Sequence, residues 1–316
     1  MNLTKVNGAL LIDKPVDLTS QDVVSRLKWA LTNNGYCEKG FKIGHGGTLD
    51  PFATGVLAVL IGEATKLADC YLHSVKAYEG HIALGKQTDS ADCTGAVVAE
   101  APVPELSEKE WQERAHSFTT KEYFQTPPMH SAKKQNGKAL YELARKGITV
   151  EREAILKKIS RYDLRLLPDH ELFFEAECES GTYVRVLSED LAKEAGTLAH
   201  LRTLRRTRSS DLTIASCQAL DTTLDQLAQK VPLSTLPHFL TLEKVATHIP
   251  SFSITEKTAQ ELKQGLQRSI QPVLQEMQAK YPDSSYGIVR LNQFPLALLE
   301  RQKELNSFRL QRILNP

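Results

Sequence analysis

The chain contains several short apolar runs, and these predict a series of buried strands. Runs with continuous or alternating apolar positions lie at residues 9–12, 56–61, 78–84, 155–166, 172–178, 286–291 and 296–299. Apolar residues at helical spacing predict helices after Thr19, near Trp111, over 184–193 and over 253–267. Thr19 supplies an N-cap for the first of these helices, and Asp22 completes a capping-box pattern.

The character of the chain changes after about residue 222. Residues 237–316 carry 10 Lys and Arg against 7 Asp and Glu, whereas residues 1–236 carry 29 against 31. We therefore predict two domains, a catalytic domain over 1–230 and a small, mildly basic domain over 231–316.

One segment of the predicted first domain is unlike its surroundings. Residues 126–147 include Pro127 and Pro128, are rich in Lys and Arg, and hold few large aliphatic side chains before Leu140. Long irregular connections in compact domains are usually functional or disordered. The sequence therefore predicts an insertion at about 122–150.

Composition excludes several classes of protein. The 316 residues are 41% hydrophobic and 24% charged, which argues against a disordered or collagen-like chain. No run approaches the roughly 18–20 apolar residues that span a bilayer, and the apolar run at 9–12 is too short for a secretory signal. The five cysteines form no CxxC pair, so we expect neither a disulfide framework nor structural zinc. A cytoplasm-like reducing compartment fits these features.

The charge balance is a weak guide to partners. The chain has 39 Lys and Arg against 38 Asp and Glu, a net charge of +1. Binding to nucleic acid depends on where positive groups lie rather than on their total. The four arginines within 200–208 either follow an RNA backbone or lie on a solvated helix face.

Residues 44–51 form the most informative loop. Three glycines around His45 permit backbone conformations that are closed to other residues. Asp50 precedes Pro51, which favours an extended conformation at Asp50. A carboxylate beside such a turn serves as a nucleophile or base, or merely caps the turn, and the residues alone leave both open. A phosphate-binding loop is not favoured, because the Walker pattern is missing.

Five segments resemble, in order, the motifs of the TruB family of RNA pseudouridine synthases. They are residues 8–15 (GALLIDKP, followed by Thr19 and Ser20), 44–57 (GHGGTLDPFATGVL), 85–95 (GKQTDSADCTG), 127–147 (PPMHSAKKQNGKALYELARKG) and 181–204. The resemblance implies an α+β fold with a mixed, mainly antiparallel central sheet and flanking helices. It also implies a small C-terminal β-rich, PUA-like RNA-binding domain, although residues 272–282 depart from that pattern.

The resemblance implies an isomerase that converts uridine to pseudouridine at position 55 in the T-arm of tRNA. Asp50 matches the catalytic aspartate, and Arg185 matches the arginine that pairs with it. Tyr78 matches the tyrosine that stacks on the target uridine. Without the motifs, Arg185 would be read as a surface arginine and Tyr78 as a core residue.

Further residues are expected to bind the RNA. The resemblance places Tyr183 and Leu204 at the uracil pocket, and it gives His45 a part in extruding the base. The remaining candidates are Lys14, Lys66, Asp92, Arg205 and Arg206. The insertion corresponds to a thumb that clamps the tRNA arm, and recognition by shape and splayed bases suits such a loop. The resemblance implies no cofactor, and no histidine pair has metal-ligand spacing.

Three alternatives stay open at this point. The chain could be the subunit of a guide-RNA-dependent pseudouridine synthase, although such subunits are expected to lack a full thumb. It could also be a non-catalytic protein that binds or folds tRNA. A glycoside or nucleoside hydrolase is a third reading, but Asp50 has no second carboxylate close in sequence. We expect a cytoplasmic monomer without an obligatory protein partner, with a nuclear or mitochondrial location open for a eukaryotic source.

Overall fold

A computed structural model describes residues 6–131, 133–135, 137–144, 146–302 and 304–315. The chain divides into two compact units. The first consists of Met1–Pro51, Gly55–Leu72 and Ser210–Pro316, and the second of Phe52–Thr54 and His73–Ser209. The domain boundary predicted near residue 230 lies inside the first unit and stays a prediction.

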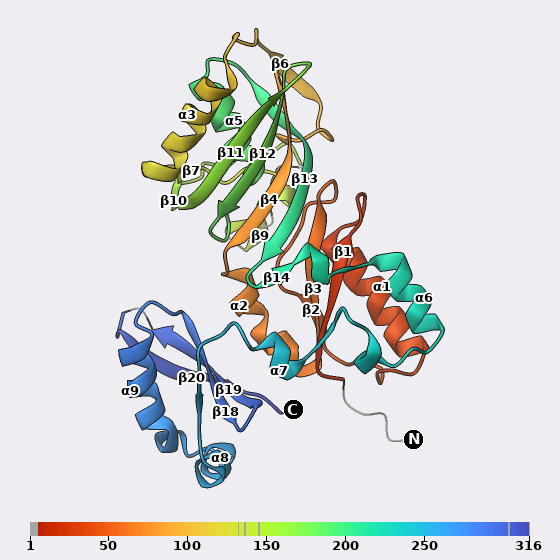
Figure 1. Cartoon of the computed structure of the whole chain (residues 1–316), viewed down its shortest axis with the longest axis vertical. Helices are drawn as coiled ribbons and strands as arrows, with labels where there is room; N and C mark the ends of the chain where they lie inside the picture. The colour runs from red at the N-terminus through yellow and green to blue at the C-terminus, as the bar shows by residue number, and fades with distance from the viewer. Residues whose placement is uncertain (1–5, 132, 136, 145, 303, 316) are drawn as a thin grey trace. The chain divides into compact units, whose positions relative to one another are not determined.

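A sheet that is buried on both faces forms the centre of the first unit (Figure 1). Its strands are β1 (Gly8–Lys14), β2 (Ile43–His45), β3 (Thr54–Ile61), β15 (Gln218–Ala219) and β16 (Phe239–Thr241). Leu10 and Ile12 pack with helices α1 (Ser20–Asn33) and α6 (Leu220–Ala228), whereas Ala9 and Leu11 face a second apolar cluster. Burial on both sides explains why the sequence shows continuous apolar runs here rather than alternation.

The predicted capping box begins α1. The Thr19 side chain accepts a hydrogen bond from the Asp22 amide at 3.0 Å, and the Asp22 carboxylate accepts one from the Thr19 amide at 2.9 Å. These bonds satisfy two backbone donors at the helix end. Short helices α2 (Ala68–Leu72) and α7 (Leu242–Val245) add to the same unit.

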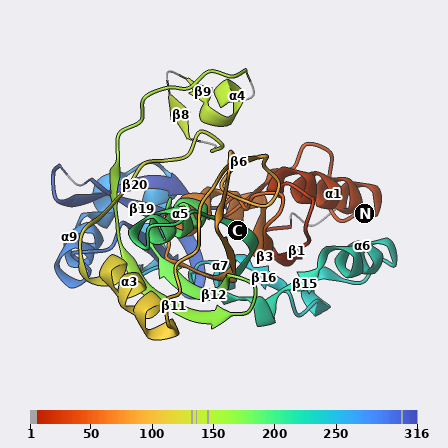
Figure 2. The same cartoon turned by 90° about the horizontal axis from the view of Figure 1, so that it is seen from above.

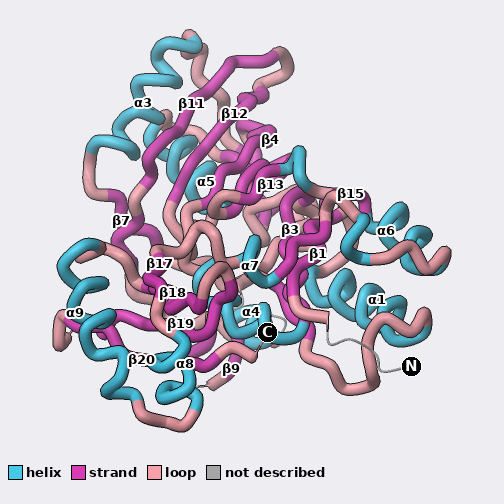
Figure 3. The backbone as a smooth tube through the Cα atoms, turned by 60° about the horizontal axis from the view of Figure 1, so that its bottom comes forward, coloured by secondary structure: helices cyan, strands magenta, loops and turns pink. Residues whose placement is uncertain are grey.

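A four-stranded sheet ends the chain. Its strands are β17 (Ser251–Ser253), β18 (Tyr286–Leu291), β19 (Phe294–Gln302) and β20 (Ser307–Ile313), in that order. Figure 3 shows helices α8 (Glu256–Lys263) and α9 (Gln271–Lys280) beside it. The segment that departs from the expected PUA-like pattern is α9, which has Pro272 in its first turn, where proline is favoured.

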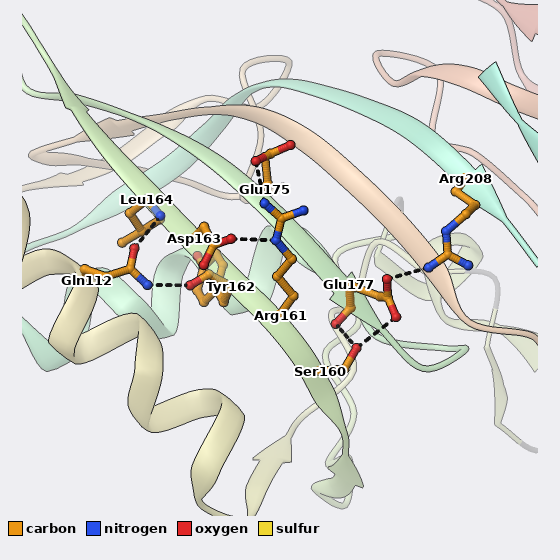
Figure 4. A network of polar contacts seen from close by, with 9 residues as sticks. All are labelled: Gln112, Ser160, Arg161, Tyr162, Asp163, Leu164, Glu175, Glu177 and Arg208. Carbon is orange, nitrogen blue, oxygen red and sulfur yellow. Dashed lines mark hydrogen bonds and ion pairs between the residues drawn. The ribbon is translucent and has the colours of Figure 1, made fainter. Parts of the chain in front are cut away.

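The second unit is built on four antiparallel strands. They run in the order β11 (Ile159–Leu167), β12 (Glu171–Cys178), β4 (Lys76–Leu84) and β13 (Ala199–Ser209). One face packs against α3 (Glu108–Thr120) and α5 (Val184–Glu194), with Phe118, Tyr162 and Phe174 in edge-to-face ring contact. The other face is polar and carries ion pairs such as that of Arg161 with Glu175 (Figure 4).

The predicted insertion lies in this unit. A ribbon of β7 (Tyr123–Gln125) and β10 (Ile155–Lys157) forms its base. Beyond it, the hairpin of β8 (Lys134–Gln135) and β9 (Lys138–Ala139) leads into α4 (Leu140–Ala144), and Figure 2 shows these elements extending away from α3 and β11. A second hairpin, β5 (Lys86–Thr88) and β6 (Val97–Glu100), follows β4, and β14 (Leu212–Thr213) follows β13.

The fold class predicted from the sequence is confirmed. The strand pairings are mainly antiparallel, with β1–β15 and β17–β18 parallel. The arginine-rich segment forms part of strand β13, so the helix-face interpretation was wrong. Arginines interrupt its apolar positions, and this masked the strand pattern.

Candidate functional site

The loop that carries Asp50 is anchored on both sides of this residue. On one side, the Leu49 amide donates to Ser20 Oγ at 2.8 Å, and the Ser20 hydroxyl lies 3.3 Å from the Leu49 carbonyl oxygen. On the other side, the Asp17 amide donates to the Pro51 carbonyl oxygen at 2.9 Å. The carboxylate is therefore presented from a loop whose flanking peptides have fixed partners.

The two predicted lysine contacts are engaged within the protein. Lys14 Nζ donates to the carbonyl oxygens of Pro15 at 2.8 Å, Leu18 at 2.6 Å and Pro51 at 3.2 Å. The Lys14 side chain is fully buried, so it ties the end of β1 to the peptide after Asp50. Lys66 Nζ donates to Glu63 at 2.6 Å and to the Ile313 carbonyl oxygen at 2.8 Å. In this structure both ammonium groups hold the fold of the first unit.

The loop around His45 packs closely against Tyr71 at Gly46. The Gly47 amide donates to His45 Nδ1 at 3.3 Å. A Cβ on Gly46 would lie 2.8 Å from Tyr71 Cβ, so only glycine fits without movement. The Tyr71 hydroxyl donates to the Val245 carbonyl oxygen at 2.7 Å and fixes the ring behind the loop.

Three candidates of the second unit share one face of its sheet. Tyr78 in β4 lies directly opposite Arg206 in β13, and Leu204 lies opposite Gly80 in the same register. Leu204 and Arg206 are buried, and Tyr78 is half-buried. A Cβ on Gly80 would clash with the Thr203 carbonyl oxygen, so the glycine permits this close approach of the two strands.

Arg185 is held by backbone carbonyl groups. It lies in the first turn of α5 and is 3% exposed. Its two terminal nitrogens donate to the carbonyl oxygens of Ser90 at 2.6 Å and His130 at 2.8 Å, and Asp92 Oδ2 lies 3.8 Å from the guanidinium. Asp92 itself orders its loop by accepting from the Thr94 amide at 2.9 Å. A buried, charged guanidinium of this kind stabilises nearby negative charge.

Tyr183 is the residue before α5, and its backbone is bound by Gln125. The Tyr183 amide donates to Gln125 Oε1 at 2.7 Å, and Gln125 Nε2 donates to the Tyr183 carbonyl oxygen at 3.0 Å. The side chain of Gln125 therefore fixes the position of the backbone just before α5, the helix that contains Arg185.

Strand alternation separates the predicted arginines. Arg206 faces the same side as Tyr78, whereas Arg205 lies opposite Glu79 on the polar face and donates to Thr54 Oγ1 at 3.2 Å. On the same side of the sheet, Arg208 forms an ion pair with Glu177 (Figure 4). Arg205 and Arg206 therefore lie on opposite faces of the sheet.

A buried lysine that the sequence did not single out lies beside these residues. Lys76 is two positions before Tyr78 in β4 and is 5% exposed. Burial, together with the positive charge of Arg206, lowers the pKa of Lys76 to about 7. Its Nζ donates to the Ser74 carbonyl oxygen at 2.7 Å.

The candidates gather in two groups, one in each unit. The first unit holds Lys14, His45, Asp50 and Lys66, and the second holds Tyr78, Asp92, Tyr183, Arg185, Leu204, Arg205 and Arg206. Sequence patterns gave no signal for Ser20, Gln125, Ser90 or His130 as supports, because each acts on or through a backbone group. Within the described residues, no helix is long and apolar enough to cross a bilayer, and no group of three or more His, Cys, Asp or Glu could hold a metal.

Comparison with known proteins identifies similar sequences. Residues 35–184 match the model of the TruB family pseudouridylate synthase N-terminal domain. A tRNA pseudouridine synthase B of Psychrobacter cryohalolentis is 44% identical over 222 residues, which are 69% of this chain and 60% of that protein. The matched part thus spans less than two thirds of that relative. A tRNA pseudouridine synthase B of Neisseria meningitidis is 34% identical over 98% of this chain and 95% of its own length.

Solved structures share the fold. A chain in a crystal structure of a Cbf5–Nop10–Gar1 complex superposes with a TM-score of 0.70, covering 98% of this chain and 85% of that one. Its sequence is 20% identical, so the likeness concerns the fold alone.

Proposed function

Because this chain belongs to the TruB family of pseudouridylate synthases, we propose that it isomerises uridine to pseudouridine at position 55 in the T-arm of tRNA. The observation that carries this proposal is the similarity to the Neisseria tRNA pseudouridine synthase B over 98% of the chain. The anchored Asp50 loop and the buried Arg185 guanidinium support it.

The proposed reaction conserves every atom of the uridine. The N1–C1′ bond breaks, the uracil turns, and a C5–C1′ bond forms. The proton on C5 then leaves, and N1 takes up a proton, so no cofactor or external reductant is needed. Asp50 attacks C1′ or C6, or removes the C2′ proton, and the three routes all need an ionised carboxylate.

The other residues have roles in placing the base. A base inside the folded T-loop must flip out before reaction, at a cost of a few kcal/mol. We assign His45 to this extrusion, Tyr78 to stacking on the flipped uracil, and Tyr183 and Leu204 to its pocket. Arg185 is the proposed partner of the catalytic aspartate, with Asp92 ordering the loop beside it.

The RNA-binding part of the proposal extends beyond the reacting base. The insertion at 122–150 serves as the thumb on the tRNA arm, and Arg206 contributes positive charge beside Tyr78. The catalytic domain at 1–230 is followed by a PUA-like RNA-binding domain at 231–316. We propose that the enzyme acts as a cytoplasmic monomer without metal, guide RNA or an obligatory protein partner.

The direct test uses an unmodified T-arm hairpin as the substrate. Purified protein should convert its target uridine without guide RNA or other proteins, as mapped by pseudouridine-specific chemistry. The Asp50→Asn variant should lose the reaction and bind the hairpin within about tenfold of the unmutated affinity, because the carboxylate acts in chemistry. Activity only with a guide RNA would favour the guide-dependent alternative, and binding without reaction by the unmutated protein would favour a tRNA-folding role.

A further inference from the structure

The side chain of Gln125 forms a buried bridge between the base of the insertion and α5. Gln125 is 1% exposed and ends β7, immediately before residues 126–147. Its amide bonds to both the N–H and the carbonyl group of Tyr183, at 2.7 and 3.0 Å. The pair of bonds matches what a neighbouring strand would supply, so the Tyr183 peptide is held in both position and direction.

A further hydrogen bond, to Tyr123, holds the side chain of Gln125 in place. Gln125 Nε2 also donates to the Tyr123 hydroxyl at 2.9 Å, and that hydroxyl donates to Asp190 Oδ2 at 2.8 Å. Asp190 belongs to α5, so the ribbon base contacts the helix at its start and again two turns later. The Gln125 side chain therefore has few alternative positions.

The same segment reaches Arg185. Arg185 lies two residues after Tyr183, and one of its terminal nitrogens donates to the His130 carbonyl oxygen at 2.8 Å. His130 lies within the insertion, five residues after Gln125. The insertion thus contacts this part of α5 twice, through the Gln125 side chain and through the His130 backbone.

We infer that Gln125 is a positioning residue of the isomerase: it couples the base of the insertion to the placement of Tyr183 and Arg185. This inference rests on the proposed function, because it gives these two residues a task in that reaction. Gln125 touches neither base nor ribose in this assignment and acts only through the Tyr183 peptide.

The expected effect lies mainly in the rate of the chemical step. Removing the amide leaves the Tyr183 N–H without this acceptor, and it leaves the Tyr183 carbonyl oxygen with the bond from the Leu187 amide alone. The peptide then shifts to find new partners, and a displacement of about 1 Å at a reacting group costs up to roughly 10²-fold in rate. Affinity for the RNA arm depends largely on phosphate contacts elsewhere, so KM should change little.

The chain offers a matched control in Gln112. Its side chain also forms two hydrogen bonds with a backbone. It donates to the Tyr162 carbonyl oxygen at 3.0 Å and accepts from the Leu164 amide at 2.7 Å (Figure 4). Gln112 joins α3 to β11 and contacts none of the proposed site residues through these bonds. Gln125→Met and Gln112→Met therefore remove the same number of backbone bonds at two places.

The experiment measures kcat, KM and Tm on the T-arm hairpin for the unmutated protein and both variants. Gln125→Met should lower kcat at least about tenfold with KM within about threefold, whereas Gln112→Met should lower Tm and keep kcat within about twofold. If both variants lose Tm equally and both keep kcat, Gln125 is a structural residue and the inference is overturned.

A second variant and the activity of the unmutated protein separate the remaining outcomes. If Gln125→Met does not fold, Gln125→Glu retains the acceptor for the Tyr183 amide but loses the donors, and kcat should fall at least about threefold; an unchanged kcat would overturn the inference. An unmutated protein that makes no pseudouridine would remove the proposed function and this inference together, whereas an active unmutated protein with a fully active Gln125→Met would remove only the inference.

Discussion

At the scale of single residues, the burial of charge beside Tyr78 has a measurable consequence. Lys76 lies directly opposite Cys178 in β12, on the same face as Tyr78 and Arg206. A buried ammonium near a buried guanidinium is favoured in its neutral form, which is why the pKa of Lys76 falls to about 7. Folding therefore releases a proton from this lysine at neutral pH and above.

This release predicts a specific pH dependence of stability. In the unfolded chain the lysine keeps its proton up to its ordinary pKa of 10.5, so between about pH 7 and 10.5 the unfolded state binds more protons. The free energy of unfolding contributed by Lys76 should therefore rise with pH in this window, by at most about 1.4 kcal/mol per pH unit. Lys76→Met lacks this titration. Because it removes a buried ammonium, we expect this variant to unfold with a larger free energy than the unmutated protein. The difference between the two should be largest at pH 6.5 and shrink by pH 9.

Urea unfolding at both pH values measures this difference. Lys121→Met, which removes an exposed lysine in the same unit, is the control and should show the same difference from the unmutated protein at each pH. A Lys76→Met advantage that stays constant between pH 6.5 and 9 would contradict the prediction.

At the scale of elements, the start of α1 has two separate tasks in adjacent residues. Thr19 caps the helix, and Ser20 uses its buried hydroxyl to bind the Leu49 backbone next to Asp50. A lost N-cap costs about 1 kcal/mol of stability without moving a loop elsewhere. A lost anchor frees the peptide that presents the proposed catalytic carboxylate.

Substituting each residue by alanine should separate these tasks. Thr19→Ala should lower the free energy of unfolding by about 1 kcal/mol and leave kcat within about twofold. Ser20→Ala should lower kcat at least about fivefold, because the Leu49 amide loses its partner and the Asp50 loop gains freedom. The measurement is kcat on the hairpin together with urea unfolding. A Ser20→Ala variant with the same kcat as Thr19→Ala would show that the bond between Ser20 and the Leu49 amide does not affect the reaction rate.

The elements also show what sequence patterns can and cannot reveal. The capping box of Thr19 and Asp22 and the strands β1 and β3 followed from local residue types, because they depend on side chains close in sequence. The strand β13 did not, since its arginines obscure the apolar alternation. Arg205 and Arg206 are adjacent in sequence, but strand geometry sends them to opposite faces.

The supports of the site were beyond prediction for a different reason. Arg185 binds the carbonyl oxygens of Ser90 and His130, which every residue type possesses. Such acceptors leave no signature in the sequence, and they come together only when distant loops fold. The motif resemblance could therefore name Arg185 but could not name what holds it.

At the scale of the whole molecule, the net charge of +1 does not show which cations lie beside a carboxylate. On the polar face of the second unit, Arg161 pairs with Asp163 and Glu175. Arg202 pairs with Glu171 at 3.2 Å in the same unit. In the insertion, Lys133 is exposed. The carboxylate beside a paired cation offsets its positive charge, so the pair attracts a phosphate less than the cation by itself would.

The salt dependence of tRNA binding should reveal which cations contact the RNA. Each phosphate contact releases condensed counterions, so losing one contact lowers the slope of log K against log salt concentration by about 1. Lys133→Ala should flatten the slope by this amount if the insertion clamps the RNA, whereas Arg202→Ala should leave it unchanged. Binding titrations between about 50 and 200 mM salt test both variants. Equal flattening by both would mean that the paired arginines also contact RNA, and an unchanged slope in Lys133→Ala would remove this lysine from the thumb contact.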